Sequence, residues 1–498
     1  MRSKAGFDTV VCVGLFLAAA LVRLLFLTGT TDRDLPFSIF YYGDSRIYRE
    51  FALTLIRGGV FDQGVPIHPP AFAYVLSWII GWVGERPFAM RAYLAIGSAT
   101  VIPMTYLLGR ALWSRAVGVT AALLATFSFG LCVVSVSANA ETLYIPLLVA
   151  QALLCILLGG AVSSNRTVKA VSLAIASGAV LGLGALTRTE HLGLAVVLPV
   201  ALAIGWPFVP RRRIVLASAA IAGVALCVIL PWTIRNHTAL TRFNAANPGL
   251  AEPLPTWVPV TASGPIVFAL ANNPRADGTF QPDTIVAKLG QGQLDLRDPE
   301  QADLYLHGYR RGWEFLTGNR QAAATLLTRK LALASDAHAL GFGLSNWPAG
   351  LTGTRRAVDL FVPDRRILKP VFWILLAVGA WVLRPVWRRA GILWLISLQV
   401  IAVSLATFGY ARFFVQFLPF VFLFQAAALD ALTSKLRSAV ARQSVAWVGA
   451  ALAVALTVEL AVANTRPLNF EASGSVNPET GKIAQDAVVN LTPAYNNR

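Results

Sequence analysis

Apolar segments about 20 residues long recur along the whole chain, and this pattern constrains the fold more than any other feature. A helix needs about 20 apolar residues to cross the hydrocarbon core of a bilayer. We therefore predict an all-α integral membrane protein with about eleven transmembrane helices and a large external loop region. The predicted spans are 9–28, 89–108, 116–136, 142–162, 170–187, 191–208, 214–231, 369–384, 390–408, 413–432 and 444–463.

The composition excludes several classes of protein. Hydrophobic residues make up 56% of the chain and charged residues only 13%, whereas soluble domains carry roughly 25% charged residues. An ordinary soluble enzyme, a disordered chain and a disulfide scaffold are therefore excluded. All four cysteines lie inside apolar segments and are predicted to be small buried hydrophobes: Cys12, Cys132, Cys155 and Cys227.

Basic residues are concentrated in short connections at one end of the predicted helices. The chain carries 42 Lys and Arg against 25 Asp and Glu, a formal net charge of +17. Under the positive-inside rule, their placement makes the N-terminus cytoplasmic and the C-terminus extracytoplasmic. It also accounts for much of the basic excess, so we predict no nucleic-acid partner. The clusters are Arg2/Lys4, Arg110/Arg115, Arg166/Lys169, Arg211/Arg212/Arg213, Arg384/Arg388/Arg389 and Lys435/Arg437/Arg442.

This orientation places two large segments, 29–88 and 232–368, outside the membrane. The short cytoplasmic connections leave no room for a catalytic domain, so any chemistry is expected at the outer face. Segment 71–84 is apolar but too short to span, and we interpret it as an interfacial or re-entrant helix. Segments 299–316 and 319–335 mix apolar and charged residues in the pattern of amphipathic helices.

Two acidic residues near predicted spans are candidates for catalysis. Asp44 follows Gly43 in an external patch, and the apolar spacing after it predicts that a helix begins there. Since Asp favours the N-cap of a helix, Asp44 is either a cap or a catalytic carboxylate. Glu141 lies at the outer end of the fourth span, where an acid is either simply hydrated or faces a cavity or partner.

Basic side chains at the same outer level are candidates for binding phosphate. Arg188, Arg235 and Arg412 each lie in a turn that ends or joins predicted spans on the outer side. Arginine there either anchors the protein to lipid headgroups or binds a lipid phosphate through its guanidinium fork. His68 precedes two prolines in an extended turn, where it binds phosphate, a metal or nothing; one isolated His is weak evidence for a metal.

Taken in order, these motifs resemble the polytopic GT-C glycosyltransferases, in particular bacterial members similar to aminoarabinose transferases and protein O-mannosyltransferases. The resemblance implies a GT-C-like catalytic module over residues 1–432, a last transmembrane helix within 433–463 and a polar external tail at 464–498. The motifs that carry it are Gly43-Asp44, His68-Pro69-Pro70, Glu141, Leu186-Thr187-Arg188, Pro231-Trp232 with Arg235-Asn236, Lys330 and Arg412.

The resemblance implies transfer of a sugar from a polyprenyl-phosphate donor to a lipid, glycan or protein acceptor at the outer face of a bacterial plasma membrane. Asp44 is then the candidate general base in an inverting displacement, and Glu141 orients the acceptor or the base. Three arginines, Arg188, Arg235 and Arg412, would bind the donor phosphate together with His68. We accordingly expect Asp44, Glu141 and at least two of these arginines to line one outer cavity.

The sequence departs from the family pattern at two places. Many relatives have a second acid directly after the first Asp, where this chain has Ser45, and an acid–Lys pair where it has Ile67-His68. The loss of these acids leaves no cofactor certain and a divalent metal open, and the acceptor of aminoarabinose transferases is not carried over.

The alternative function is a transporter or flippase for a lipid-linked envelope component. A transporter would place ionisable residues deep within its helices and break helices near mid-membrane. Few charges lie deep in the predicted spans and the acids cluster outside, which favours the enzyme.

Overall fold

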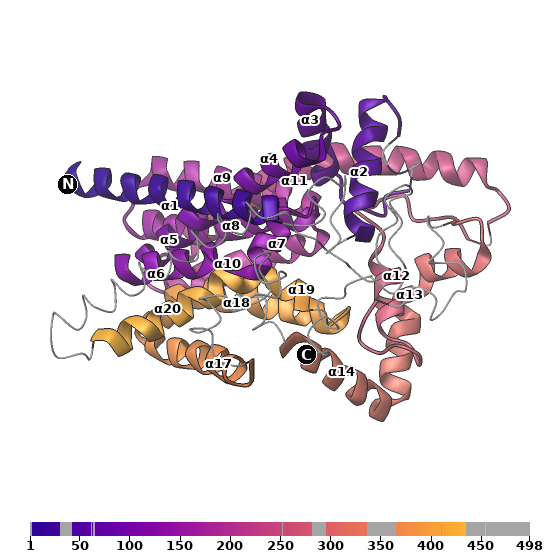
Figure 1. Ribbon diagram of the computed structural model, residues 1–498. Helices are drawn as coiled ribbons and strands as arrows, with labels where there is room; N and C mark the ends of the chain where they lie inside the picture. The colour runs from indigo at the N-terminus through magenta and orange to yellow at the C-terminus, as the bar shows by residue number, and fades with distance from the viewer. Residues whose placement is uncertain are drawn as a thin grey trace.

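The protein is a bundle of membrane-length helices with a smaller group of helices at one end (Figure 1). The structure is a computed structural model. It describes residues 2–29, 42–60, 62, 65–250, 252–280, 295–335, 365–409, 411–434 and 454. All regular elements within these ranges are helices, as predicted for an all-α membrane protein.

Seven helices among the described residues are long and apolar enough to cross a bilayer, so the chain is an integral membrane protein. Three of these spans each consist of two consecutive helices. The seven spans are α1 (Arg2–Gly29), α4 with α5 (Pro87–Ser98, Val101–Leu112), α8 (Ala140–Ser163), α9 (Thr167–Thr187), α11 (Arg211–Ala246), η6 with α18 (Arg384–Val386, Trp387–Ala406) and η7 with α20 (Val415–Phe417, Leu418–Ser434).

The predicted count of eleven spans is not confirmed. Span 116–136 is a broken pair, α6 (Arg115–Thr126) and α7 (Phe129–Ser135), which bend by 62° where Ser128 caps the second helix. Counting this pair as one span gives eight. The segments at 191–208 and 369–384 form shorter apolar helices, Thr189–Gly205 and Lys369–Val382. Of the last predicted span, 444–463, only residue 454 is described.

The short apolar segment after the two prolines is helix α3 (Ala71–Val83), only 13 residues long. It packs against α2 (Tyr42–Ile56), with Phe72 and Leu76 of α3 in one core cluster with Tyr48 and Ala52 of α2. Its Trp82 is exposed, which is typical of an aromatic residue at a membrane interface. The helix is thus too short to span, as expected.

Helix α11 carries the chain beyond the bundle. Its 36 residues give a length of about 54 Å, well above the roughly 30 Å of a bilayer core. The helices that follow it are α12 (Gly264–Ala271), α13 (Pro299–Gly318) and α14 (Arg320–Ser335), and they lie at the opposite end of the molecule from the N-terminus (Figure 1). Helices are thus present at both segments that were predicted to be amphipathic, as α13 and α14.

Candidate active site

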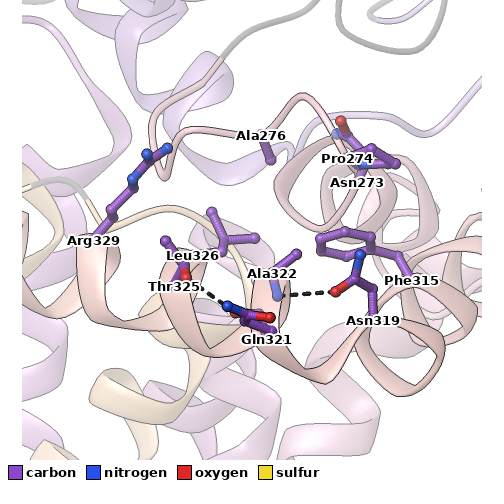
Figure 2. Close-up of a pocket in the computed structure, with 10 residues that line it drawn as sticks. All are labelled: Asn273, Pro274, Ala276, Phe315, Asn319, Gln321, Ala322, Thr325, Leu326 and Arg329. Atoms are coloured by element: carbon purple, nitrogen blue, oxygen red, sulfur yellow. Dashed lines mark hydrogen bonds between the residues drawn. The ribbon is translucent and has the colours of Figure 1, made fainter.

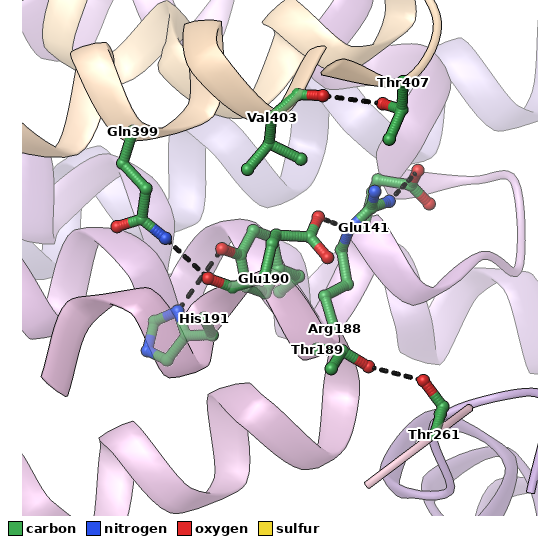
Figure 3. A network of polar contacts seen from close by, with 10 residues as sticks. Glu141, Arg188, Thr189, Glu190, His191, Thr261, Gln399, Val403 and Thr407 are labelled. Atoms are coloured by element: carbon green, nitrogen blue, oxygen red, sulfur yellow. Dashed lines mark hydrogen bonds and ion pairs between the residues drawn. The ribbon is translucent and has the colours of Figure 1, made fainter. Parts of the chain in front are cut away.

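A buried ion pair joins the start of α8 to the end of α9. Glu141 lies in the first turn of α8, where the helix dipole favours an acid. Arg188 has an extended backbone conformation and lies between α9 and the following helix η2 (Thr189–Gly193). Glu141 Oε1 accepts a hydrogen bond from Arg188 Nη1 at 2.6 Å (Figure 3). Of the two alternatives for Glu141, hydrated or facing a cavity or partner, the structure shows a partner, and the residue is only 6% exposed.

Arg188 contacts a second carboxylate and two aromatic rings besides Glu141. Its Nε donates to Glu190, and its guanidinium lies over the rings of Tyr144 at 5.7 Å and Phe413 at 5.5 Å. Burial alone would lower the pKa of Arg188, but the charges of Glu190 and Glu141 outweigh it and raise the pKa above its usual value. Its Nη2 makes no hydrogen bond to any residue in the described ranges. Arg188 is therefore permanently charged, and two carboxylates already balance that charge.

The first turn of α2 docks onto the segment that leads into α8. Ser45, fully buried, donates to the carbonyl of Ser137 and lies 3.0 Å from Asn139 Oδ1. Asn139 is the N-cap residue of α8, two residues before Glu141. Since Asp44 directly precedes Ser45, its backbone lies beside the start of α8. The serine that replaces the second acid of the family pattern therefore forms this junction.

Asp44 is the third residue of α2 and lies within the helix rather than before it, so the backbone does not place it at an N-cap. Its side chain lies outside the described residues. His68 packs on the same helix, with its ring 6.2 Å from that of Tyr48 and 5.3 Å from that of Phe51. Tyr48 is four residues after Asp44 and therefore on the same helix face. His68 thus lies next to the face of α2 that carries Asp44.

Arg412 belongs to a short helix that reaches Arg188. This helix is α19 (Ala411–Phe414), and the neighbouring Phe413 supplies one of the rings beneath the Arg188 guanidinium. The backbone of Arg412 is therefore one residue from a direct contact with Arg188. Its side chain lies outside the described residues.

The third predicted arginine, Arg235, has a carboxylate partner that sequence reasoning missed. Both terminal nitrogens of its guanidinium contact Asp62, with Nη1 2.9 Å from Oδ2. The guanidinium also lies 4.6 Å above the ring of Trp232. The pair joins the turn after α2 to α11, across 173 residues of sequence. No motif or spacing marks Asp62 in the sequence, because the contact exists only once these elements pack together.

A buried lysine holds the corner between α18 and α19. Lys330 of α14 is 1% exposed, and its Nζ donates to the Leu405 carbonyl and to Asn272 Oδ1, both at 3.0 Å. Asn272 in turn donates to the Ala406 carbonyl at 2.7 Å. Burial lowers the pKa of Lys330 to about 8. Lys330 and Asn272 together satisfy carbonyls at the end of α18, just before the helix that carries Arg412.

The structure thus brings together some of the predicted site residues. It joins Glu141 to Arg188, sets the backbones of Asp44 and Arg412 beside that pair, and gives Arg235 a separate partner. Four neighbours were not assigned to the site from the sequence: Ser45, Asp62, Glu190 and Gln399. The amide of Gln399 donates to the Glu190 carbonyl (Figure 3). The shared cavity and the roles of the six predicted residues stay predictions.

The comparisons with known proteins agree with this architecture. Residues 67–234 match the profile of a family described as dolichyl-phosphate-mannose-protein mannosyltransferase. The match includes His68, Glu141 and Arg188 but stops one residue before Arg235. Among curated proteins, none was found to match the sequence.

Solved structures of a larger archaeal enzyme share the fold. The apo oligosaccharyltransferase of Archaeoglobus fulgidus superposes with a TM-score of 0.52 at 13% identity, covering 91% of this chain and 56% of that one. The complex of AglB from Archaeoglobus fulgidus with an inhibitory peptide and a dolichol-phosphate gives 0.50 at 16% identity, with coverages of 92% and 56%. The chain therefore spans little more than half of the archaeal protein.

A third similar structure is ArnT from Cupriavidus metallidurans bound to undecaprenyl phosphate. It is 14% identical with a TM-score of 0.37, covering 86% of this chain and 78% of that one, a similarity too low to argue from. The archaeal structures therefore show that this chain shares the fold of the oligosaccharyltransferase.

Proposed function

We propose that this protein, which has the fold of the GT-C glycosyltransferases, transfers a sugar from a polyprenyl-phosphate donor to an acceptor at the outer face of a bacterial plasma membrane. The observation that carries the proposal is the junction of three elements: the start of α2 with Asp44, the Glu141–Arg188 pair, and α19 with Arg412. A base, an oriented acid and cations for a leaving phosphate are the groups that such a transfer requires.

In this proposal Asp44 accepts the proton of an acceptor hydroxyl as its oxygen attacks the anomeric carbon. The bond from that carbon to the phosphate oxygen breaks, polyprenyl phosphate leaves, and the single displacement inverts the anomeric centre. Glu141 orients the acceptor or the base from the first turn of α8. The sugar is a hexose or pentose, and the acceptor is a lipid, glycan or protein of the cell envelope.

The leaving phosphate needs cations that are not already neutralised. Arg188 has two carboxylate partners, so within the described residues the cluster Glu141–Arg188–Glu190 has a formal charge of −1. We assign the main part to Arg412, whose helix α19 contacts Arg188 through Phe413, with His68 and the Nη2 edge of Arg188 as further donors. Arg235 can bind a phosphate only if its ion pair with Asp62 breaks. We therefore assign Arg235 the smallest role in binding the leaving phosphate.

The donor class is supported by what the similar proteins bind. The matched family description names a dolichyl-phosphate mannose donor, and AglB was solved with a dolichol-phosphate. The orientation predicted from the basic clusters places the α12–α14 end outside and the N-terminus inside. Because the chain spans only 56% of the archaeal enzyme, the peptide acceptor of that enzyme is not transferred to this protein.

A metal is not assigned to the site. One structure of the archaeal enzyme contains Zn and sulfate. In the described part of this chain, no three His, Cys, Asp or Glu side chains are grouped closely enough to hold a metal ion. Glu141 is already bonded to a guanidinium. The described acids of the site therefore do not fit a metal, and no step is routed through one.

The direct test is transfer of labelled sugar from purified polyprenyl-phosphate donors in membranes containing wild type or Asp44→Asn. Loss of a general base is expected to lower the transfer rate by about 100-fold or more. Glu50→Gln is the matched control, because Glu50 lies on the same helix, is exposed and pairs only with Arg46 among the contacts described.

Equal transfer by wild type and Asp44→Asn would exclude Asp44 as the base. Absence of transfer from every donor, together with substrate-driven flux, would favour the transporter.

A further inference from the structure

A cavity of about 350 Å³ lies on the external helices, away from the Glu141–Arg188 pair. One side is α14, and the others are the end of α13 and the turn at residues 273–276 that follows α12 (Figure 2). Its volume is within the range of small-molecule sites. Asn319 and Phe315 lie at one end of the cavity and Arg329 at the other. Arg329 follows Asn319 by ten residues, which corresponds to about 15 Å of helix.

The lining combines one aromatic face with amides. The ring of Phe315 has no aromatic or cationic partner among the residues that the structure describes, and Ala322 and Leu326 complete an apolar wall. Gln321 adds an amide side chain without a hydrogen-bond partner in the described ranges. A sugar ring presents an apolar C–H face and hydroxyl groups at its edge, so aromatic rings beside amide donors and acceptors suit it.

The cation at the other end of the cavity has no carboxylate partner in the part of the chain that the structure describes. Arg329 is exposed and makes no ion pair within the described residues. Helix α14 contains Arg320, Arg329 and Lys330 and no acidic residue. A guanidinium with free N–H groups binds carboxylate or phosphate through two parallel hydrogen bonds.

The cavity is connected to the candidate active site through one helix. Arg329 precedes Lys330, whose buried ammonium holds the end of α18, and α19 with Phe413 then reaches Arg188. A ligand held by α14 is therefore bound to the element that positions Arg412.

We propose that this cavity binds an anionic saccharide, a sugar that carries a carboxylate or phosphate group, as a distal unit of the acceptor glycan. Phe315 packs against the sugar ring, Gln321 binds hydroxyl groups, and Arg329 binds the anionic group. The assignment of this saccharide to the acceptor rests on the proposed transferase function. The saccharide site itself does not, since binding is measured without a donor.

The test is binding of the purified full chain to an array of neutral, uronic-acid and phosphate-bearing oligosaccharides. Wild type should bind acidic members, and Arg329→Gln should lower that signal by about tenfold or more, as expected for loss of a bidentate contact. Phe315→Ala should weaken binding as well, and Arg329→Lys should restore part of it. Arg320→Gln is the matched control, because Arg320 lies on the same helix but outside the cavity lining.

The possible outcomes separate the alternatives. Binding that is equal for neutral and acidic oligosaccharides, or unchanged in Arg329→Gln, would overturn the proposal, as would no binding. Displacement of the acidic glycans by vesicles of phosphatidylglycerol, but not phosphatidylcholine, would identify a lipid headgroup as the anion and overturn the acceptor assignment. Asp44→Asn should bind the array normally, so failure of the catalytic proposal and failure of this one are distinguishable.

Discussion

At the scale of single residues, Arg188 connects the most parts of the candidate site. It bonds Glu141 and Glu190 and lies over two aromatic rings from different helices. A buried carboxylate is costly without a partner, so the energetic role of Arg188 is first to pair with Glu141 and hold it in place. The phosphate binding that we propose for Arg188 is secondary to this role.

This role predicts strong coupling between the two residues. Arg188→Gln leaves Glu141 buried without its cation and should destabilise the protein by about 3–5 kcal/mol. Glu141→Gln should cost less, because Glu190 still pairs with Arg188. The double variant should recover part of the loss, as measured by thermal unfolding in detergent. Effects that simply add, within about 0.5 kcal/mol, would show that the pair is not coupled.

The Asp62–Arg235 contact leads to a different expectation. If Arg235 mainly holds the turn after α2 against α11, Asp62→Asn should reduce sugar transfer as much as Arg235→Gln does. The double variant should be no worse than either single variant, because one contact is lost in all three. Transfer rates and thermal stability of the three proteins check this. An Arg235→Gln defect much larger than that of Asp62→Asn would instead favour direct phosphate binding by Arg235.

At the scale of elements, the site depends on corners between helices rather than on any one helix. The corner between α18 and α19 is held by Lys330 of α14 and Asn272 at the end of α12. A positive charge at the C-terminal end of a helix is favourable, but burial acts against the charged form of Lys330. The corner that carries Arg412 is thus sensitive to the protonation of one lysine.

The lowered pKa of Lys330 predicts a pH effect. Its ordinary value is 10.5 and its folded value about 8, so between these values the unfolded chain binds more protons than the folded one. Stability should therefore rise with pH from about 8 towards 10.5, and below pH 8 the full cost of burying the charge is present. Lys330→Met should lack this rise, whereas the exposed Lys169→Met should keep it. The melting temperature of each protein measured from pH 7 to 10 tests this, and parallel curves for all three would contradict it.

At the scale of the whole molecule, helices α12–α14 and the N-terminus lie at opposite ends of the bundle (Figure 1). The candidate site lies towards the end with α12–α14, where α2, α8, α9 and α19 meet. This separation agrees with the orientation inferred from the basic clusters, which would place the site on the extracytoplasmic side.

The orientation can be tested by labelling single introduced cysteines with a membrane-impermeant maleimide. Thr317→Cys, at the end of α13, should be labelled in intact cells. Ser164→Cys, in the turn between α8 and α9, should be labelled only after permeabilisation. The native sequence already contains four cysteines, so wild type sets the background. The reverse labelling pattern would invert the topology and move the proposed chemistry to the cytoplasm.

Much of the fold could be predicted from local sequence patterns. The apolar segments, the short helix at 71–83 and the amphipathic helices α13 and α14 all follow from hydrophobic length and period, which are properties of neighbouring residues. The number of spans was harder to predict. An N-cap residue such as Ser128 ends one helix and begins another within an apolar segment that hydrophobicity alone predicts as one helix. Glu141 and Arg188 were also identified from their place at the ends of apolar segments.

The sequence by itself determined the class of protein and the position of the polar residues at the ends of the apolar spans. It also determined which charged residues are candidates for the site. Each of these depends only on residues that are close together in the chain. The tertiary structure alone decided the partners. Arg188 binds an acid 47 residues away and Arg235 one 173 residues away. Charges at the same level look equivalent in a sequence, and packing determines which of them are neutralised and which stay free for a ligand.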